Sequence, residues 1–243
     1  MSEPLSDFAG ITGALRAFGL TPAVFHAADD RALVVALEAI SVLRHEVERH
    51  QALAAAELAR RSRAGFGQQW LARRDGHTSA GAMLQSITRS SKRDAAALVA
   101  VGEMVADVEA AAELDRLRHD PDIAAVLPDV APPWFAALGD AVVTGLLTVA
   151  LADAIRSGLG EPGGDADEGC LRTELETLIP LCRTVHADAA RRAARQARDR
   201  IDTAGVQTRA DRQQLAQFWR VWVKPDGSVR GEFELEPEAK ACT

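Results

Sequence analysis

The stretch TRSSKRDAAALVAVGEMVADVEAAAELDRL (residues 88–117) decides the predicted fold, because it is rich in alanine and in other residues that favour helix. Ser91 followed by Asp94 is an S-x-x-D pattern, which is typical of a helix start. Directly before it, HTSAGAMLQSI (77–87) predicts a shorter helix capped by Ser79. Two helices joined by ITRSS predict a helix-turn-helix-like unit.

A long helix is predicted upstream, from Asp29 or Asp30 to about Arg61. Its apolar residues recur at helical spacing and predict a core-facing stripe. The members of this stripe are Leu33, Leu37, Ile40, Val47 and Leu58.

Further helices are predicted on both sides of an acidic Gly/Pro loop. A short helix is expected at 66–72, another begins near PPWFAALGDAV (132–142), and Thr148 caps VALADAIRSGL (149–159). Helices are also expected at about 170–186, 187–203 and 208–217. The predicted organisation is an N-terminal helical region (1–160), the loop (161–169) and a C-terminal region (170–243), packed together as one domain.

The closing stretch WRVWVKPDGSVRGEFELEPE (219–238) has the alternation of a β-hairpin, with a turn at KPDGS. A lone hairpin is barely stable in water, so one face is expected to pack on helices or on a third strand. The predicted fold class is therefore mainly α: a multi-helix bundle with a helix-turn-helix-like unit and a C-terminal β-hairpin.

Composition agrees with close-packed helices, since aromatic residues make up 5% of the chain and tyrosine is absent. The three cysteines match no zinc pattern and no CxxC motif, and they are expected to be reduced thiols. The N-terminus lacks a signal-peptide pattern, and no apolar run is long enough to span a membrane. We therefore predict a cytoplasmic protein without membrane contact.

Charge is unevenly distributed along a chain whose net charge is −7. Residues 60–94 hold eight cations and two anions, a local charge of +6, and residues 183–212 hold eight arginines and four aspartates, a local charge of +4. Such asymmetry permits a basic face on an acidic protein.

Catalytic motifs are missing from the sequence. There is no GxSxG, phosphate-binding loop, dinucleotide fingerprint or zinc-protease pattern, and no cluster of His, Asp and Asn suits a nuclease metal. Cys182 and His186 are four residues apart, but no third group completes a catalytic arrangement. We predict no catalytic residue, no metal and no cofactor, and enzymatic activity is left open with a preference for none.

The predicted nucleic-acid-binding residues are cations on the basic segments. Arg89, Lys92 and Arg93 lie at the start of the second helix of the helix-turn-helix-like unit, where side chains and backbone amides meet phosphate. Two further groups are Arg73 with Arg74, and Arg191, Arg192 and Arg195. The alternative is that these cations are solvated surface without a partner.

Several strings in order resemble one known family: ELARRS, HTSAGAMLQSITRSSKRDAAALVAVGEM, LPDVAPPWFAALGDAVVTGLLTVALADAIRSGL, ARQARDRID and WRVWVKPDGSVRGEFELEPE. The chain is similar, over roughly 5–240, to the actinobacterial thirteen-E-twelve repeat family, whose shared region is domain of unknown function 222. The resemblance implies a bacterial helical domain that usually precedes an HNH endonuclease module.

Two departures from the family pattern bear on function. No HNH residues follow, and PEAKACT (237–243) looks like the first turn of a helix that relatives continue. Leu146 and Leu151 stand where relatives commonly carry polar residues or histidine.

Three functions follow from these observations. The first is a non-catalytic DNA-associating domain related to HNH endonucleases but lacking the nuclease module. It is expected to be either a truncated relative or a domain that works with a separate nuclease, and a homo-oligomer is a further expected partner. The alternative is a protein-interaction or oligomerisation scaffold without nucleic-acid binding. A metal-dependent nuclease is disfavoured for want of ligands.

Overall fold

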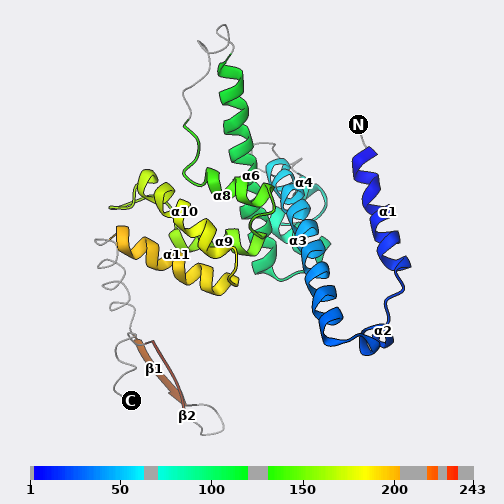
Figure 1. Ribbon diagram of the computed structural model, residues 1–243. Helices are drawn as coiled ribbons and strands as arrows, with labels where there is room; N and C mark the ends of the chain where they lie inside the picture. Colours follow the sequence, from blue (N-terminus) through cyan, green and yellow to red (C-terminus); the bar gives the residue numbers. More distant parts are fainter. Residues whose placement is uncertain (1–2, 63–70, 120–130, 203–217, 224–228, 235–243) are drawn as a thin grey trace. The chain divides into compact units, whose positions relative to one another are not determined.

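The computed structural model describes residues 3–62, 71–119, 131–202, 218–223 and 229–234 (Figure 1). The chain divides into two compact units, Met1–Val47 and Glu48–Thr243. Helices make up nearly all of the described residues, which confirms the prediction of a mainly α-helical protein. The boundary falls inside a long helix, so the predicted N-terminal region (1–160) is divided, and its residues 48–160 belong to the same unit as residues 170–243.

The first unit consists of α1 (Glu3–Ala17), α2 (Pro22–Ala27) and the beginning of α3 (Asp30–Arg61). Gly19 has a φ of 60°, which allows the chain to turn after α1. The Asp29 carboxylate accepts a 2.7 Å hydrogen bond from the Ala32 N–H and so caps α3. The predicted long helix and its start are confirmed.

The apolar stripe at the beginning of α3 is not buried. Leu37, Ile40 and Val47 are 54%, 45% and 42% exposed, and no described residue from 7 to 47 is buried. The prediction that this stripe faces the core is therefore wrong for the first unit. Further along, Leu58 packs against the core of the second unit, as predicted.

The second unit is a bundle built on the end of α3 and seven further described helices. These are α4 (Leu71–Arg74), α5 (Ala80–Thr88), α6 (Lys92–Arg118), α8 (Ala136–Val143), α9 (Val149–Leu159), α10 (Glu168–Cys182) and α11 (Ala187–Ile201). Helix α6 lies against α5, α8 and α9, while α9 packs along α11 (Figure 1). Met104, Leu138, Ile155 and Leu175 are among the fully buried side chains at the centre.

Small residues let these helices approach closely. A Cβ atom added to Gly102 would lie 1.9 Å from the Ala52 carbonyl oxygen, so α6 and α3 nearly touch there. A Cβ atom on Gly158 would lie 2.5 Å from Ala194 Cβ, where α9 meets α11. The alanine-rich composition thus serves close helix packing.

Side-chain caps fix several helix starts. Ser79 caps α5, Thr148 caps α9, and Ser91 forms a capping box with Asp94 at α6, all as predicted. His186 caps α11 by accepting a 3.2 Å hydrogen bond from the Ala189 N–H at its Nδ1 atom.

The loop between α9 and α10 is braced by one arginine of α11. The Arg198 guanidinium donates to the carbonyl oxygens of Leu159, Glu161 and Gly163 at 3.1, 2.7 and 3.0 Å. Its Nε donates at 3.1 Å to the carboxylate of Asp202, which is only 3% exposed. Helix α11 therefore holds in place part of the segment that the sequence predicts as an acidic Gly/Pro loop.

Two strands, β1 (Phe218–Val223) and β2 (Val229–Glu234), pair antiparallel with Phe218 opposite Glu234. The predicted turn at 224–228 and the predicted helix at 208–217 lie outside the described residues, as does most of the short helix at 66–72. A hairpin that closes the helical domain therefore stays a prediction.

Candidate nucleic-acid interface

The corner between α5 and α6 is anchored by apolar residues and tightened by hydroxyl groups. Leu84, Ala95 and Leu98 are buried on its inner side. Thr88 Oγ1 donates to the Leu84 carbonyl oxygen at 2.8 Å and lies 2.7 Å from Ser90 Oγ. These contacts hold the three-residue connection, Arg89 to Ser91, between the two helices.

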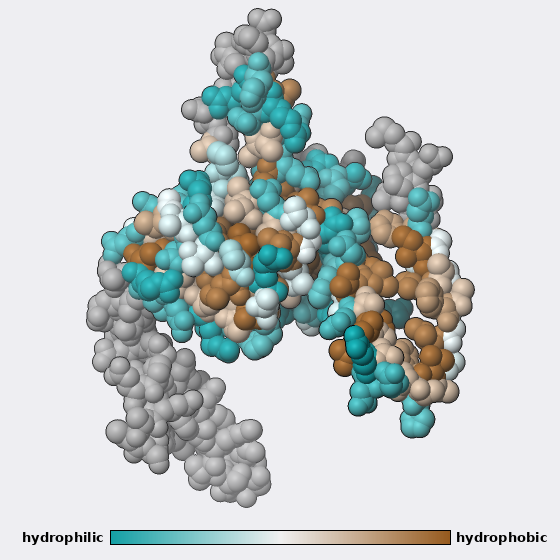
Figure 2. All heavy atoms as spheres, viewed as in Figure 1, coloured by the Kyte–Doolittle hydropathy of each residue, from teal (hydrophilic) through white to brown (hydrophobic). Residues whose placement is uncertain are grey.

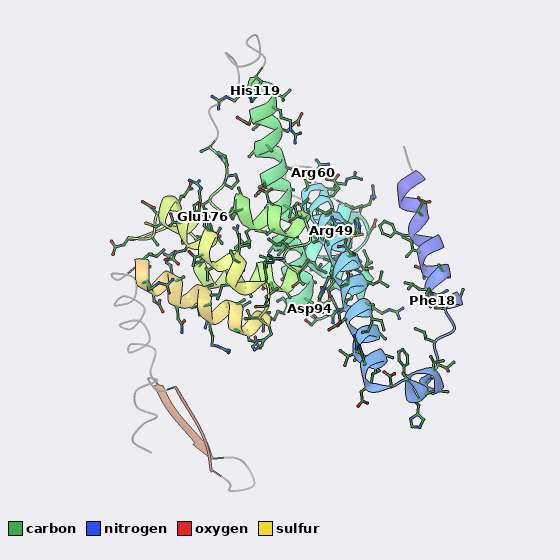
Figure 3. All side chains as sticks on the ribbon, viewed as in Figure 1. Phe18, Arg49, Arg60, Asp94, His119 and Glu176 are labelled. Carbon is green, nitrogen blue, oxygen red and sulfur yellow. The ribbon has the colours of Figure 1, made fainter. Side chains whose placement is uncertain are left out.

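The capping box completes the corner at the start of α6. Ser91 Oγ accepts from the Asp94 N–H at 3.1 Å and also lies 2.7 Å from the Asp94 carboxylate, which in turn accepts from the Ser91 N–H at 3.4 Å. Figure 3 marks Asp94 at this end of α6 and His119 at the other. Because this acid occupies the helix start, positively charged side chains must supply any contact with phosphate.

Arg89 sits at the turning point in the left-handed backbone region, with φ 54° and ψ 28°. It is the one residue other than glycine with a positive φ among those the structure describes. Glycine or asparagine usually fills this position, since a left-handed conformation costs other residues about 1–2 kcal/mol. The corner thus keeps a strained arginine where glycine would fit better.

The three cations of the corner are exposed. Within the described parts of the chain, no ion pair or hydrogen bond engages the side chains of Arg89, Lys92 or Arg93. With Asp94 they give the corner a charge of three minus one, or +2. The structure therefore brings together these three predicted residues as one exposed cationic surface, which we call the basic corner.

Two cations at the start of α6 oppose its helix dipole. Lys92 and Arg93 lie in the first turn, where cations are unfavourable by about 0.3–1 kcal/mol each. Asp94 in the same turn, and Arg116 and Arg118 in the last turn, interact favourably with the dipole. The dipole therefore stabilises the other terminal charges of α6 but not Lys92 and Arg93.

Arg73 and Arg74 are also exposed, at the end of α4. This short helix is fixed by Ala72, which is fully buried and whose N–H donates to Ser62 Oγ at 3.2 Å. Arg74 lies 3.5 Å from the Asp75 carboxylate, a contact between exposed groups that contributes little to stability. Both arginines point cationic groups into solvent.

The three predicted arginines of α11 differ in whether they form an ion pair. Arg191 makes a 3.0 Å ion pair with Asp153, both 26% exposed, and this pair joins α11 to α9. Arg192 and Arg195 are exposed, and Arg195 lines a 460 Å³ pocket that also carries Glu161. Of the three predicted residues, Arg192 is the least constrained by acidic neighbours.

A groove of about 440 Å³ between α3 and α6 has the opposite charge. Leu53 and Gly102 are part of its lining, and Glu57, Glu103 and Asp107 are among its acids. Hydrogen bonds from two exposed arginines, Arg60 and Arg61, lower the pKa of Glu57 to about 2, so this carboxylate is charged at neutral pH. Phosphate would be repelled here, which separates this surface in character from the basic corner.

Cys182 and His186 both have structural roles. Cys182 is fully buried, and burial raises the pKa of its thiol, while the ring of His186 serves as a helix cap. No group of three potential metal ligands gathers within the described ranges. Among the helices described, none is long and apolar enough to cross a lipid bilayer.

Comparisons with protein-family models, with curated proteins and with solved structures found no match for this chain. The residues of the site are therefore the basis on which function is argued. Two of its features escape prediction from sequence: the strained backbone of Arg89, which carries no glycine or asparagine signal, and the ion pair of Arg191, whose partner is 38 residues away.

Proposed function

We propose that this chain is a non-catalytic DNA-associating helical domain, related to the regions that precede HNH nuclease modules. The basic corner is its principal contact surface. The single observation that carries the proposal is the strained, exposed Arg89 beside Lys92 and Arg93, three cations without a partner among the described residues.

Strain and unfavourable dipole interactions argue for a role outside the fold. Both lower the free energy of unfolding, and the side chains of Arg89, Lys92 and Arg93 make no described contact that offsets this cost. A polyanion that binds the basic corner would supply the missing interaction. The phosphate backbone of DNA is such a polyanion, and arginine and lysine are its usual partners.

The contact is proposed to be directed at phosphate rather than at base edges. The capping box already satisfies backbone groups at the start of α6, so the helix offers cationic side chains more than open amides. Binding should consequently be weakly dependent on sequence. Arg73, Arg74, Arg192 and Arg195 are proposed as additional phosphate contacts, whereas Arg191 is engaged with Asp153.

The remaining parts of the proposal follow from the family resemblance. A C-terminal β-hairpin would close the helical domain, and a separate module would supply any cleavage of DNA. The protein would act in the bacterial cytoplasm, where its cysteines stay reduced.

The proposal is tested by titrating a labelled duplex at low salt and following fluorescence polarisation. The triple variant Arg89→Ala, Lys92→Ala, Arg93→Ala should bind at least about tenfold more weakly than the wild type, since three phosphate contacts are lost. The matched control Arg60→Ala, Arg61→Ala, Arg116→Ala removes three exposed arginines that pair with nearby glutamates and should change the affinity by about twofold at most.

Two outcomes would contradict the proposal. One is a wild-type chain that binds no duplex at low salt. The other is an equal loss in the test and control variants, because the affinity would then reflect net charge rather than the basic corner.

The alternative function, a protein-interaction scaffold, is favoured by a different observation. The first unit exposes many large apolar side chains, which typical monomers avoid.

A further inference from the structure

The groove of about 440 Å³ between α3 and α6 is formed largely by small residues. It is lined by residues 53–60 and 102–110, the segments that follow the closest approach of the two helices at Ala52 and Gly102. Alanine side chains are too short to fill the space between two helices, so the groove stays open. Besides Gly102, the apolar members of its lining are Leu53, Ala56, Ala106 and Ala110.

The charged members of the lining are mostly acidic. Four acids and one cation, Arg60, give the lining a charge of −3. Arg61 lies outside the lining but also binds one of these acids, and counting it leaves −2. The four acids are Glu57, Glu103, Asp107 and Glu109.

Two of these carboxylates have no cation beside them. Asp107 and Glu109 are exposed, and within the described parts of the chain neither carboxylate forms an ion pair or a hydrogen bond. The groove therefore combines an apolar lining of small residues with two carboxylates open to a partner.

We propose that this groove binds a cationic amphipathic helix of a protein partner. Small apolar residues of that helix pack on the alanines of the groove, and its arginine or lysine side chains pair with Asp107 and Glu109. The inference is independent of DNA association, because it concerns a surface other than the basic corner.

The dimensions of the groove suit a helix. Residues 102–110 span about 12 Å along α6, which is about two turns of a helix lying beside it. A lining of alanine and glycine lets such a helix approach closely, since the distance between packed helices depends on the side chains at the contact. An amphipathic helix in an apolar groove is a recurring mode of protein recognition.

Charge complementarity selects a cationic partner. The pKa of Glu57, about 2, keeps this carboxylate charged at neutral pH, so an anionic helix would be repelled. An uncharged apolar helix would cover Asp107 and Glu109 without pairing them, which is unfavourable. The same groove of a second copy would place like charges opposite each other.

The test measures binding of a labelled peptide to the full chain by fluorescence polarisation. The probe is an alanine-based helix of about 20 residues with arginine at every fourth position, and the control peptide has glutamate at the same positions. The arginine peptide should bind the wild type, and the glutamate peptide should bind at least about tenfold more weakly.

Variants of the protein locate the contact. The double variant Asp107→Asn, Glu109→Gln should bind the arginine peptide at least about fivefold more weakly. The matched control Glu113→Gln, Asp115→Asn makes the same changes in the hydrophilic C-terminal end of α6, outside the groove lining, and should change the affinity by about twofold at most (Figure 2). Ala106→Gln places a longer uncharged side chain at an exposed position in the groove and should also weaken binding by at least about fivefold.

Four outcomes would overturn the proposal. They are no binding of the arginine peptide, equal binding of the glutamate peptide, equal losses in the two double variants, and full affinity in Ala106→Gln. Displacement of the peptide by an equal concentration of spermidine would overturn it as well, because positive charge without a helix would then be sufficient.

Discussion

Replacing Arg89 by glycine is expected to stabilise the protein and to weaken DNA binding at once. At φ 54° and ψ 28°, the arginine pays about 1–2 kcal/mol of backbone strain that glycine avoids. Glycine also lowers the free energy of unfolding by about 0.4–1 kcal/mol, because it gives the unfolded chain more conformational freedom. The free energy of unfolding should therefore rise by about 0.5–1 kcal/mol.

The comparison that isolates this effect is Arg89→Gly against Arg89→Ala. Both variants lose the charge and its repulsion from Lys92 and Arg93, but alanine keeps the strain. In urea unfolding, the glycine variant should be the more stable of the two, while both should lose about 0.9 from the salt slope of duplex binding. Equal stability would refute the strain argument, and unchanged DNA binding in both would refute the role of Arg89.

Three further predictions concern the fold. Gly102→Ala should destabilise the second unit by about 1–3 kcal/mol in urea unfolding, because its Cβ would lie 1.9 Å from the Ala52 carbonyl oxygen. The control Gly81→Ala, whose Cβ would be 3.9 Å from its nearest neighbour, should stabilise the unit instead, because alanine favours helix over glycine. Arg198→Ala should cost about 3 kcal/mol or more and speed proteolysis of the loop that it braces, and unchanged cleavage would argue against that bracing. The lowered pKa of Glu57 means that the stabilising contribution of its carboxylate is present above pH 4.5 and is lost as pH falls toward about 2. The wild type and Glu57→Gln should therefore differ in urea midpoint at neutral pH and converge near pH 2. A difference that stays constant with pH would contradict this assignment.

Local signals in the sequence were sufficient for the helices. The S-x-x-D pattern at Ser91 and the caps at Ser79 and Thr148 predict helix starts that the structure confirms, because capping depends on residues within one turn. The same holds for the extent of α3.

Features that depend on long-range geometry could not be predicted. Arg198 belongs to a basic run in the sequence, yet it reaches carbonyl oxygens 35 to 39 residues away. The apolar pattern of α3 correctly predicts a helix, but periodicity cannot say which neighbour covers the stripe. The basic corner could be predicted in part. The sequence predicts Arg89, Lys92 and Arg93 at one helix start, but it does not predict the left-handed backbone conformation of Arg89.

The most direct test of the central claim, that the basic corner binds the phosphate backbone, is the salt dependence of wild-type duplex affinity. If three to seven cations neutralise phosphates, the plot of log K against log salt should have a slope of about −3 to −6. From about 50 to 200 mM salt the affinity should fall by about 40-fold or more. An affinity that stays constant across this range would contradict the account.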